Sequence, residues 1–244
     1  MAAQTLPIAE AFTSIQGEGV RTGAPSRFIR VAGCNLRCGW CDTPYASWAP
    51  EGDAVSIDAL VQDAASAGVP DAVLTGGEPM LFDAIEPLSR ALRAAGLHIT
   101  IETAGTIHRP PANGDSGLAC DLMSLSPKLS TSTPAADDPR DPTGVWRERH
   151  EQRRIDLESL QRLLNDYPCR QIKFVATAPA DLAEIDQLLS RLTGWKPGEV
   201  MLMPEGVTTP KPGATDWVLQ ACLDRGWRYC HRLHIELFGN TRGT

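Results

Sequence analysis

The sequence predicts an α/β fold, namely a partial (incomplete) TIM-like barrel of about six parallel strands with flanking helices. Short apolar segments alternate with amphipathic segments of helical period along most of the chain. This alternation is typical of βαβ units, which build a parallel sheet. The strand-like segments are too few for a closed eight-stranded barrel. In such folds the chemistry lies at the carboxyl ends of the strands.

The elements follow in chain order. Strands are expected at residues 26–32, 72–75, 98–102, 171–176 and 200–203, with a further apolar patch at 122–125. Helices are expected at residues 56–67, 83–95, 157–165, 182–192 and 215–225. Ser56 is a suitable N-cap, while Gly68 and Gly96 follow the first two helices as stop residues.

The length of 244 residues favours one domain, residues 1–244, with an insertion loop at about 129–155. Two polar, turn-rich stretches interrupt the alternation, at residues 110–117 and 128–144, and the second indicates an exposed insertion. The basic residues between 147 and 154 alternate with acidic ones, as on a solvated helix face.

Charge and hydropathy exclude several classes of partner. The formal net charge of −7 argues against nucleic-acid binding, which needs clustered Lys and Arg. No apolar run is long enough to span a membrane, and residues 1–12 lack the basic and apolar regions of a secretory signal. We therefore expect a cytoplasmic protein without a membrane partner.

Three of the seven cysteines, Cys34, Cys38 and Cys41, lie within eight residues and directly follow a predicted strand. Three thiolates at this spacing can ligate three of the four irons of a [4Fe–4S] cluster and leave one iron open. A structural zinc site normally uses four Cys or His ligands, and no His precedes residue 97. Zinc binding and a simple reduced-cysteine loop remain the alternatives. The other four cysteines are expected to pack in the core.

Further polar motifs follow later strands. In Thr75-Gly76-Gly77-Glu78-Pro79, the glycines allow a close backbone approach and the carboxylate can accept from an ammonium group. The segment 126–128 offers donors for a carboxylate or ribose. Glu102 and the segment 203–206 end two more strands and can reach the same mouth. Simple strand-end turns are the alternative interpretation.

The segment before the first predicted strand points to a substrate. Glu18 can accept two donors from a guanidine-like edge, and Gln16 can both donate and accept. Arg30 can pair with a carboxylate in a bidentate way. Together they suit a pterin-like edge that carries an acidic group. An N-terminal cap with exposed polar residues is the structural alternative.

The cysteine spacing with Trp40 before the third cysteine resembles the signature of the radical S-adenosylmethionine (SAM) superfamily. With Gln-Gly-Glu-Gly, Thr-Gly-Gly-Glu-Pro, Glu-Thr-x-Gly-Thr, Ser-Pro-Lys and the C-terminal pattern after Leu233, the chain is similar to the 7-carboxy-7-deazaguanine synthases. The resemblance implies a lyase of queuosine and 7-deazapurine biosynthesis, in which a 5′-deoxyadenosyl radical takes hydrogen from 6-carboxy-5,6,7,8-tetrahydropterin. Ammonia is then lost and SAM is regenerated. It also implies a homodimer and a flavodoxin-type electron donor.

The resemblance assigns residues to three sites, although it assigns no catalytic acid or base. The substrate would contact Ile15, Gln16, Gly17, Glu18, Arg30, Thr75 and His234. SAM would contact Trp40, Cys41, Asp42, Gly77, Glu78, Glu102, Ser126, Pro127, Lys128, Met203, Pro204 and Glu205. Cys34, Cys38 and Cys41 would hold the cluster, and Thr43 would ligate Mg²⁺, which favours oxygen ligands.

The chain departs from the family pattern at two places. Ala104 stands where the family usually has Asn. In some relatives the C-terminal carboxylate reaches the substrate, but this tail continues past His234 to Thr244, so that role is not transferred. Whether the insertion is a lid stays open. The rival functions are another radical SAM enzyme, such as a glycyl-radical activase or peptide modifier, and a non-catalytic zinc or Fe–S binding module.

Overall fold

The computed structural model describes residues 4–244; residues 1–3 of the predicted domain lie outside the described residues. Nine strands form one sheet in the order β3-β1-β2-β4-β5-β6-β7-β8-β9. The strands are β1 (Thr5–Ile15), β2 (Pro25–Val31), β3 (Asp53–Ser56), β4 (Asp71–Gly76), β5 (His98–Thr103), β6 (Leu122–Leu125), β7 (Arg170–Ala176), β8 (Val200–Pro204) and β9 (Arg228–Tyr229). From β2 to β9 all neighbours are parallel, whereas β1 is antiparallel to both β2 and β3. The predicted mostly parallel, unclosed sheet is confirmed.

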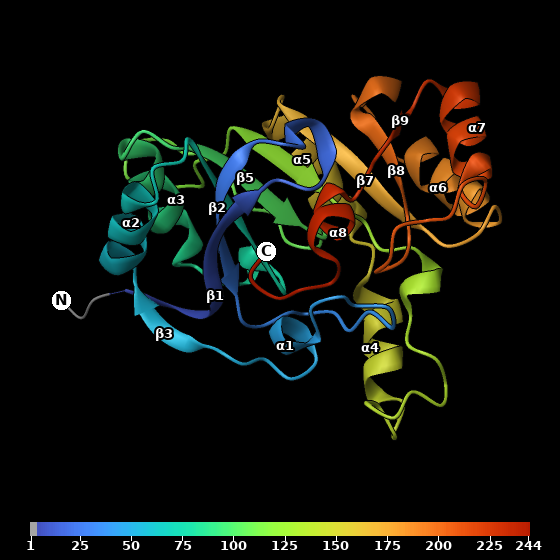
Figure 1. Ribbon diagram of the computed structural model, residues 1–244, viewed down its shortest axis with the longest axis horizontal. Helices are drawn as coiled ribbons and strands as arrows, with labels where there is room; N and C mark the ends of the chain where they lie inside the picture. Colours follow the sequence, from blue (N-terminus) through green and yellow to red (C-terminus); the bar gives the residue numbers. More distant parts are fainter. Residues whose placement is uncertain (1–3) are drawn as a thin grey trace.

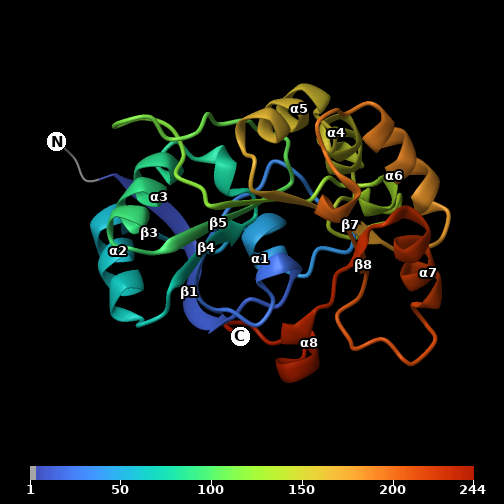
Figure 2. The ribbon, with the colours of Figure 1, turned by 90° about the horizontal axis from the view of Figure 1, so that it is seen from above.

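The helices are α1 (Pro44–Ser47), α2 (Ile57–Ser66), α3 (Ile85–Ala94), α4 (Val145–Arg153), α5 (Leu157–Asp166), α6 (Asp181–Ser190), α7 (Asp216–Arg225) and α8 (Leu233–Phe238). In Figure 1 and Figure 2, α2, α3, α5, α6 and α7 follow the outside of the curved sheet, and α1 lies within the curve. The helix α8 and the C-terminus lie at the open side. None of the described helices is long and apolar enough to cross a membrane.

The five strands and five helices predicted from periodicity are all present, with ends shifted by at most a few residues. Ser56 caps α2 as expected, because its hydroxyl accepts from the Ala59 amide at 3.3 Å. The strand β1 was not among the predicted strands. It escapes the alternating pattern because a β-bulge between Ile8 and Glu10 shifts its register against β2.

The insertion is less exposed than the sequence predicts. Ser132 and His150 are fully buried, and α4 turns His150 inward although its neighbours are solvated. The expected core packing of the remaining cysteines holds for Cys222 and Cys230, whereas Cys169 is exposed. The composition of the insertion predicted an exposed loop because most of the residues that it buries are polar.

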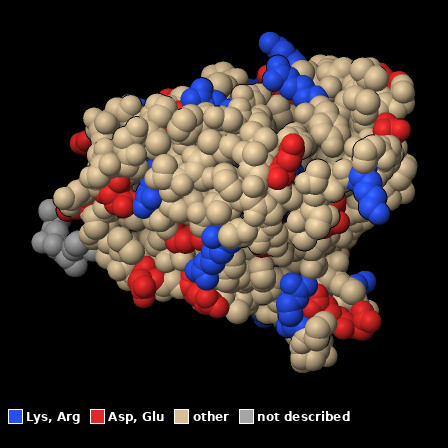
Figure 3. All heavy atoms as spheres, in the orientation of Figure 1, with Lys and Arg blue, Asp and Glu red and all other residues tan. Residues whose placement is uncertain are grey.

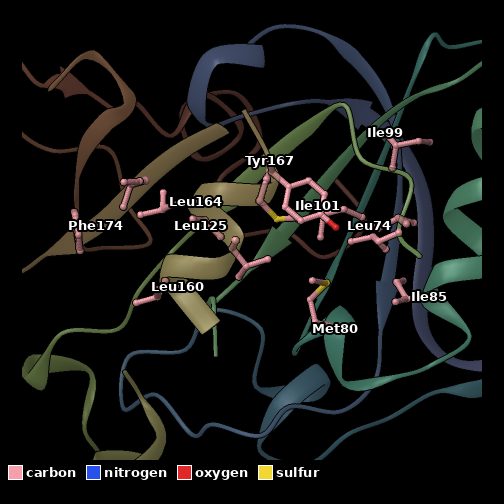
Figure 4. Close-up of a cluster of buried hydrophobic side chains, with 14 of the residues drawn as sticks. Leu74, Met80, Ile85, Ile99, Ile101, Leu125, Leu160, Leu164, Tyr167 and Phe174 are labelled. Carbon is pink, nitrogen blue, oxygen red and sulfur yellow. The ribbon is translucent and has the colours of Figure 1, made fainter. Parts of the chain in front are cut away.

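The main core lies between the sheet and the outer helices. Figure 4 shows how the side chains of strands and helices meet there. The labelled residues are Leu74, Met80, Ile85, Ile99, Ile101, Leu125, Leu160, Leu164, Tyr167 and Phe174. On the face drawn in Figure 3, basic and acidic side chains are interspersed. Apolar packing thus fixes the sheet, and the opposite, concave side remains for polar groups.

We predict that Leu74→Ala lowers the free energy of unfolding by about 2–5 kcal/mol, because it leaves a cavity under α3 in a fully buried part of β4. The matched control Leu223→Ala changes a side chain that is 67% exposed on α7 and should cost less than about 0.5 kcal/mol. Urea denaturation of both variants measures the difference. Equal losses would contradict this placement of the core.

Candidate active site

One cavity of about 490 Å³ lies at the carboxyl ends of the parallel strands. Residues at or near the ends of β2, β4, β5, β7 and β8 line it. The cysteine loop, the segment after β1, α8 and the last residues of the chain complete its wall. This is the position at which an open parallel sheet binds its ligands.

The structure brings most of the predicted site residues to this cavity. Those that line it are Ile15, Gln16, Gly17, Glu18, Arg30, Cys34, Cys38, Trp40, Cys41, Asp42, Thr43, Thr75, Gly77, Glu102, Ser126, Lys128, Met203 and His234. Four predicted SAM contacts are not among the lining residues, namely Glu78, Pro127, Pro204 and Glu205. Pro204 and Glu205 border a separate small recess beside Arg232.

Glu78 is fully buried and already has protein partners. Its carboxylate accepts from the Met80 and Ala104 amides at 3.0 and 2.9 Å and from the Thr103 hydroxyl at 2.8 Å. Burial raises its pKa. The geometry therefore gives Glu78 a role in joining the ends of β4 and β5, and its contact with an ammonium group stays a prediction.

Gly77 permits close packing of two loops. A side chain there would place its Cβ 2.1 Å from the Gly33 carbonyl oxygen. The neighbouring Glu78 amide donates to that same carbonyl at 2.9 Å. The glycines at the end of β4 thus hold the start of the cysteine loop directly against the sheet.

The three cysteines of the loop are among the residues that line the cavity. Burial raises the pKa of the Cys34 and Cys38 thiols to about 12. Cationic iron would stabilise the thiolates that burial disfavours. Among residues 4–244, no three His, Cys, Asp or Glu side chains converge closely enough to hold a single ion. Three thiols that line one cavity can supply the three ligands that a [4Fe–4S] cluster with one open iron requires.

The insertion packs against the outside of this loop. His150 links the two, because its ring accepts from the Arg37 amide at 3.2 Å and its other nitrogen contacts the Ser132 hydroxyl at 2.8 Å. The Arg37 guanidinium lies 4.0 Å from the centre of the Trp146 ring. Burial lowers the pKa of His150 to about 4, so it is neutral near pH 7. The insertion thus orders the segment that carries the cysteines.

A second group of lining residues forms a polar network. The Glu102 carboxylate accepts from the Gln16 side-chain amide at 3.1 Å and from the Thr75 hydroxyl at 2.8 Å. Glu102 was grouped with SAM contacts, yet it directly joins two predicted substrate contacts. It therefore orients them toward one another.

Glu18 is held between two cations. Its carboxylate contacts the Lys173 ammonium and accepts from Arg232 Nε at 3.2 Å. Burial by itself would raise the pKa of Glu18, but Lys173, Arg232 and His234 together lower it to about 2. Burial would likewise lower the pKa of Lys173, and Glu18 and Glu102 raise it instead. Both groups therefore remain charged over the whole physiological range.

Gly17 allows His234 to reach the cavity wall. A Cβ at position 17 would lie 2.0 Å from Nδ1 of His234. The Leu233 amide donates to the Gly17 carbonyl at 2.9 Å, which fixes the start of α8 against the segment after β1. Gly17 is therefore required by packing, whatever its contact with a ligand.

Sequence reasoning missed several lining residues, above all Lys173, Glu10, Tyr45 and the tail 240–244. A signal existed for Lys173, since a lysine within an otherwise apolar strand is rarely buried without a charged partner. The tail belongs to the C-terminal pattern of the family resemblance, but no site role was predicted for it.

The cysteine loop at the end of a parallel strand, beside a cavity in a partial barrel, defines a radical SAM enzyme. In agreement, the profile of the Radical SAM superfamily matches residues 28–128. Membership of this superfamily implies a [4Fe–4S] cluster and SAM.

Comparisons over nearly the whole chain identify a family within the radical SAM superfamily. The chain is 45% identical to the 7-carboxy-7-deazaguanine synthase of Rhodopirellula baltica, over 98% of this chain and 89% of that protein. It is 43% identical to that of Halobacterium salinarum, over 98% and 93% of the two chains. The crystal structure of QueE from Escherichia coli superimposes with a TM-score of 0.68 at 26% identity, covering 94% of this chain and 95% of that one. The chain belongs to the 7-carboxy-7-deazaguanine synthase family.

We predict that Lys173→Met lowers the free energy of unfolding at pH 7 by about 3 kcal/mol, because it leaves the buried Glu18 carboxylate with Arg232 alone. The double variant Glu18→Gln/Lys173→Met should regain most of this loss. Urea denaturation of the three proteins measures both steps. A double variant as unstable as Lys173→Met would contradict the pairing.

The Glu18–Lys173 pair also predicts how the free energy of unfolding depends on pH. The pKa of Glu18 is lower in the folded protein, at about 2, than its ordinary value of 4.5. The stability it contributes is therefore complete above about pH 5 and is lost as the pH falls toward 2. The deficit of Lys173→Met should shrink through this window. A deficit that is constant from pH 7 to pH 3 would argue against an ionised Glu18.

Proposed function

We propose that the chain converts 6-carboxy-5,6,7,8-tetrahydropterin to 7-carboxy-7-deazaguanine and ammonia, as in queuosine and other 7-deazapurine biosynthesis. The observation that carries the proposal is one cavity lined both by the cysteine triplet and by Gln16, Glu18 and Arg30. The conversion balances without an external oxidant, because product and ammonia together contain the atoms of the substrate. SAM is thus used catalytically.

The lining residues divide into one set for the cluster and SAM and another set for the substrate. Cys34, Cys38 and Cys41 would hold the cluster, which together with SAM would supply a carbon radical able to take a hydrogen atom from the substrate. Trp40, Asp42, Gly77, Ser126 and Lys128 line the wall nearby and bind SAM. The Lys128 ammonium lies 5.7 Å from the centre of the Trp40 ring, which orders a cationic donor for the SAM carboxylate.

The substrate lies against the polar network. Glu18 is a fixed anion and accepts the N–H donors of the guanidine-like edge. Gln16, oriented by Glu102, adds a donor and an acceptor. Arg30 binds the substrate carboxylate with its terminal nitrogens, which make no hydrogen bond to another described residue. Ile15, Gly17, Thr75 and His234 complete this wall.

Thr43 is proposed to ligate Mg²⁺. It lines the cavity and is the N-cap of α1, yet its hydroxyl makes no capping hydrogen bond. A hydroxyl that is not used for capping suits Mg²⁺, which takes its remaining ligands from water and the substrate carboxylate. We further propose a single cytoplasmic domain that acts as a homodimer and receives electrons from a flavodoxin-type donor.

The activity is tested anaerobically with dithionite, SAM and the carboxytetrahydropterin. We expect carboxydeazaguanine and ammonia in equal amounts, together with iron and no zinc in the purified protein. Cleavage of SAM without a deazaguanine product would favour another radical SAM enzyme. A zinc-loaded, iron-free protein would favour a binding module.

The Mg²⁺ site is tested with Thr43→Ala, for which we expect the Mg²⁺ concentration needed for half-maximal rate to rise at least about tenfold. Thr43→Ser keeps the hydroxyl and serves as the matched control. The iron content should be normal in both variants. An unchanged Mg²⁺ dependence in Thr43→Ala would refute the assignment.

A further inference from the structure

The last residues of the chain form part of the cavity wall. All of residues 240–244 line it, although they follow α8 and have no regular secondary structure. In Figure 1 the C-terminus lies beside β1. Because this segment has no regular secondary structure, its place depends on the contacts that its side chains make.

Arg242 anchors this segment. Its guanidinium lies 4.1 Å from the centre of the Tyr45 ring, and Nη2 donates to the Ala9 carbonyl at 3.0 Å. Nε lies 3.5 Å from a Glu10 carboxylate oxygen, and Nη1 lies 3.5 Å from Glu51. One side chain therefore contacts β1, α1 and the loop after α1. Since it is 47% exposed, each ion pair alone is weak, and the stacking and backbone contacts matter more.

Glu10 connects this anchor to the proposed carboxylate site. It pairs with Arg30 across β1 and β2, and its carboxylate accepts from Arg30 Nε and from the Tyr45 hydroxyl, both at 2.6 Å. These two contacts use one carboxylate oxygen, and the other faces Arg242. Arg30 is thus held through Nε, which leaves its two terminal nitrogens for a ligand.

We propose that Arg242 is a positioning residue for the substrate. It holds the tail across the cavity mouth, and through Glu10 it fixes the orientation in which Arg30 receives the substrate carboxylate. This inference rests on the proposed function. The tail and the carboxylate site then form one unit, so that a substrate that pairs with Arg30 is also covered by residues 240–244.

The holoenzyme variant Arg242→Ala tests the proposal. We expect the KM for the carboxytetrahydropterin to rise about tenfold while kcat changes far less, because a positioning contact made in the ground state is lost. We also expect more 5′-deoxyadenosine to be released per product formed, since an open mouth admits solvent. Iron content and thermal midpoint should match those of Arg225→Ala, a control that removes an exposed arginine paired with Asp186 on the far helices.

A double-mutant cycle with Glu10→Gln tests whether Arg242 acts through Glu10. If the two residues act through one network, the double variant Glu10→Gln/Arg242→Ala should raise KM no more than the stronger single variant. A KM and product ratio equal to those of Arg225→Ala, or effects that multiply in the double variant, would overturn the proposal. If the wild-type enzyme makes no carboxydeazaguanine, the proposed function itself fails. Normal wild-type turnover with an unaffected Arg242→Ala variant refutes the positioning role alone.

Discussion

The ion pair between Glu18 and Lys173 connects two distant parts of an open sheet, in which no strand pairing closes a barrel. Lys173 lies on β7, and Glu18 follows β1, which stands five places from β7 in the strand order. The segment around Glu18 also reaches β7 through Val20, whose amide donates to the Gln171 side chain at 2.9 Å. Arg232 then joins Glu18 to the start of α8. The cavity exists because these polar contacts bridge the gap that hydrogen bonds between strands do not close.

Bridging the gap with charge has a physical consequence. Burying a carboxylate and an ammonium disfavours both charged forms, and their mutual contact offsets this cost together with Arg232 beside Glu18 and Glu102 near Lys173. The arrangement is stable as long as all partners are present, so the loop after β1 is ordered only together with β7 and α8. The walls that contact the substrate are thereby fixed before it binds, which lowers the entropy lost on binding.

How far the sequence predicts the structure depends on the range of each interaction. Five helices and the inner parallel strands follow from local periodicity and were predicted with nearly correct ends, whereas α1 and α8 were not predicted. The segment β1 was not predicted either, because its bulge shifts the pairing register and breaks the alternation. The cysteine triplet was predicted to bind a cluster from spacing alone. The partners of Glu18 were not predictable, since Lys173 and Arg232 reach it only after the sheet has curved. Glu10 meets Arg30 through the pairing of β1 with β2, and β1 was not a predicted strand. The inward turn of His150 is also a tertiary effect that composition cannot show.

The charge states in the cavity limit what its side chains do. Glu18 and Lys173 have pKa values shifted away from neutrality in opposite directions, so neither exchanges a proton near pH 7. Burial lowers the pKa of His234, which is therefore a neutral imidazole there. Fixed charges can bind and orient a pterin but cannot carry protons through a reaction. This suits hydrogen-atom abstraction, in which the protein must hold the substrate and exclude water. The same requirement explains why so much of the chain, from the insertion to the tail, is used to enclose one cavity.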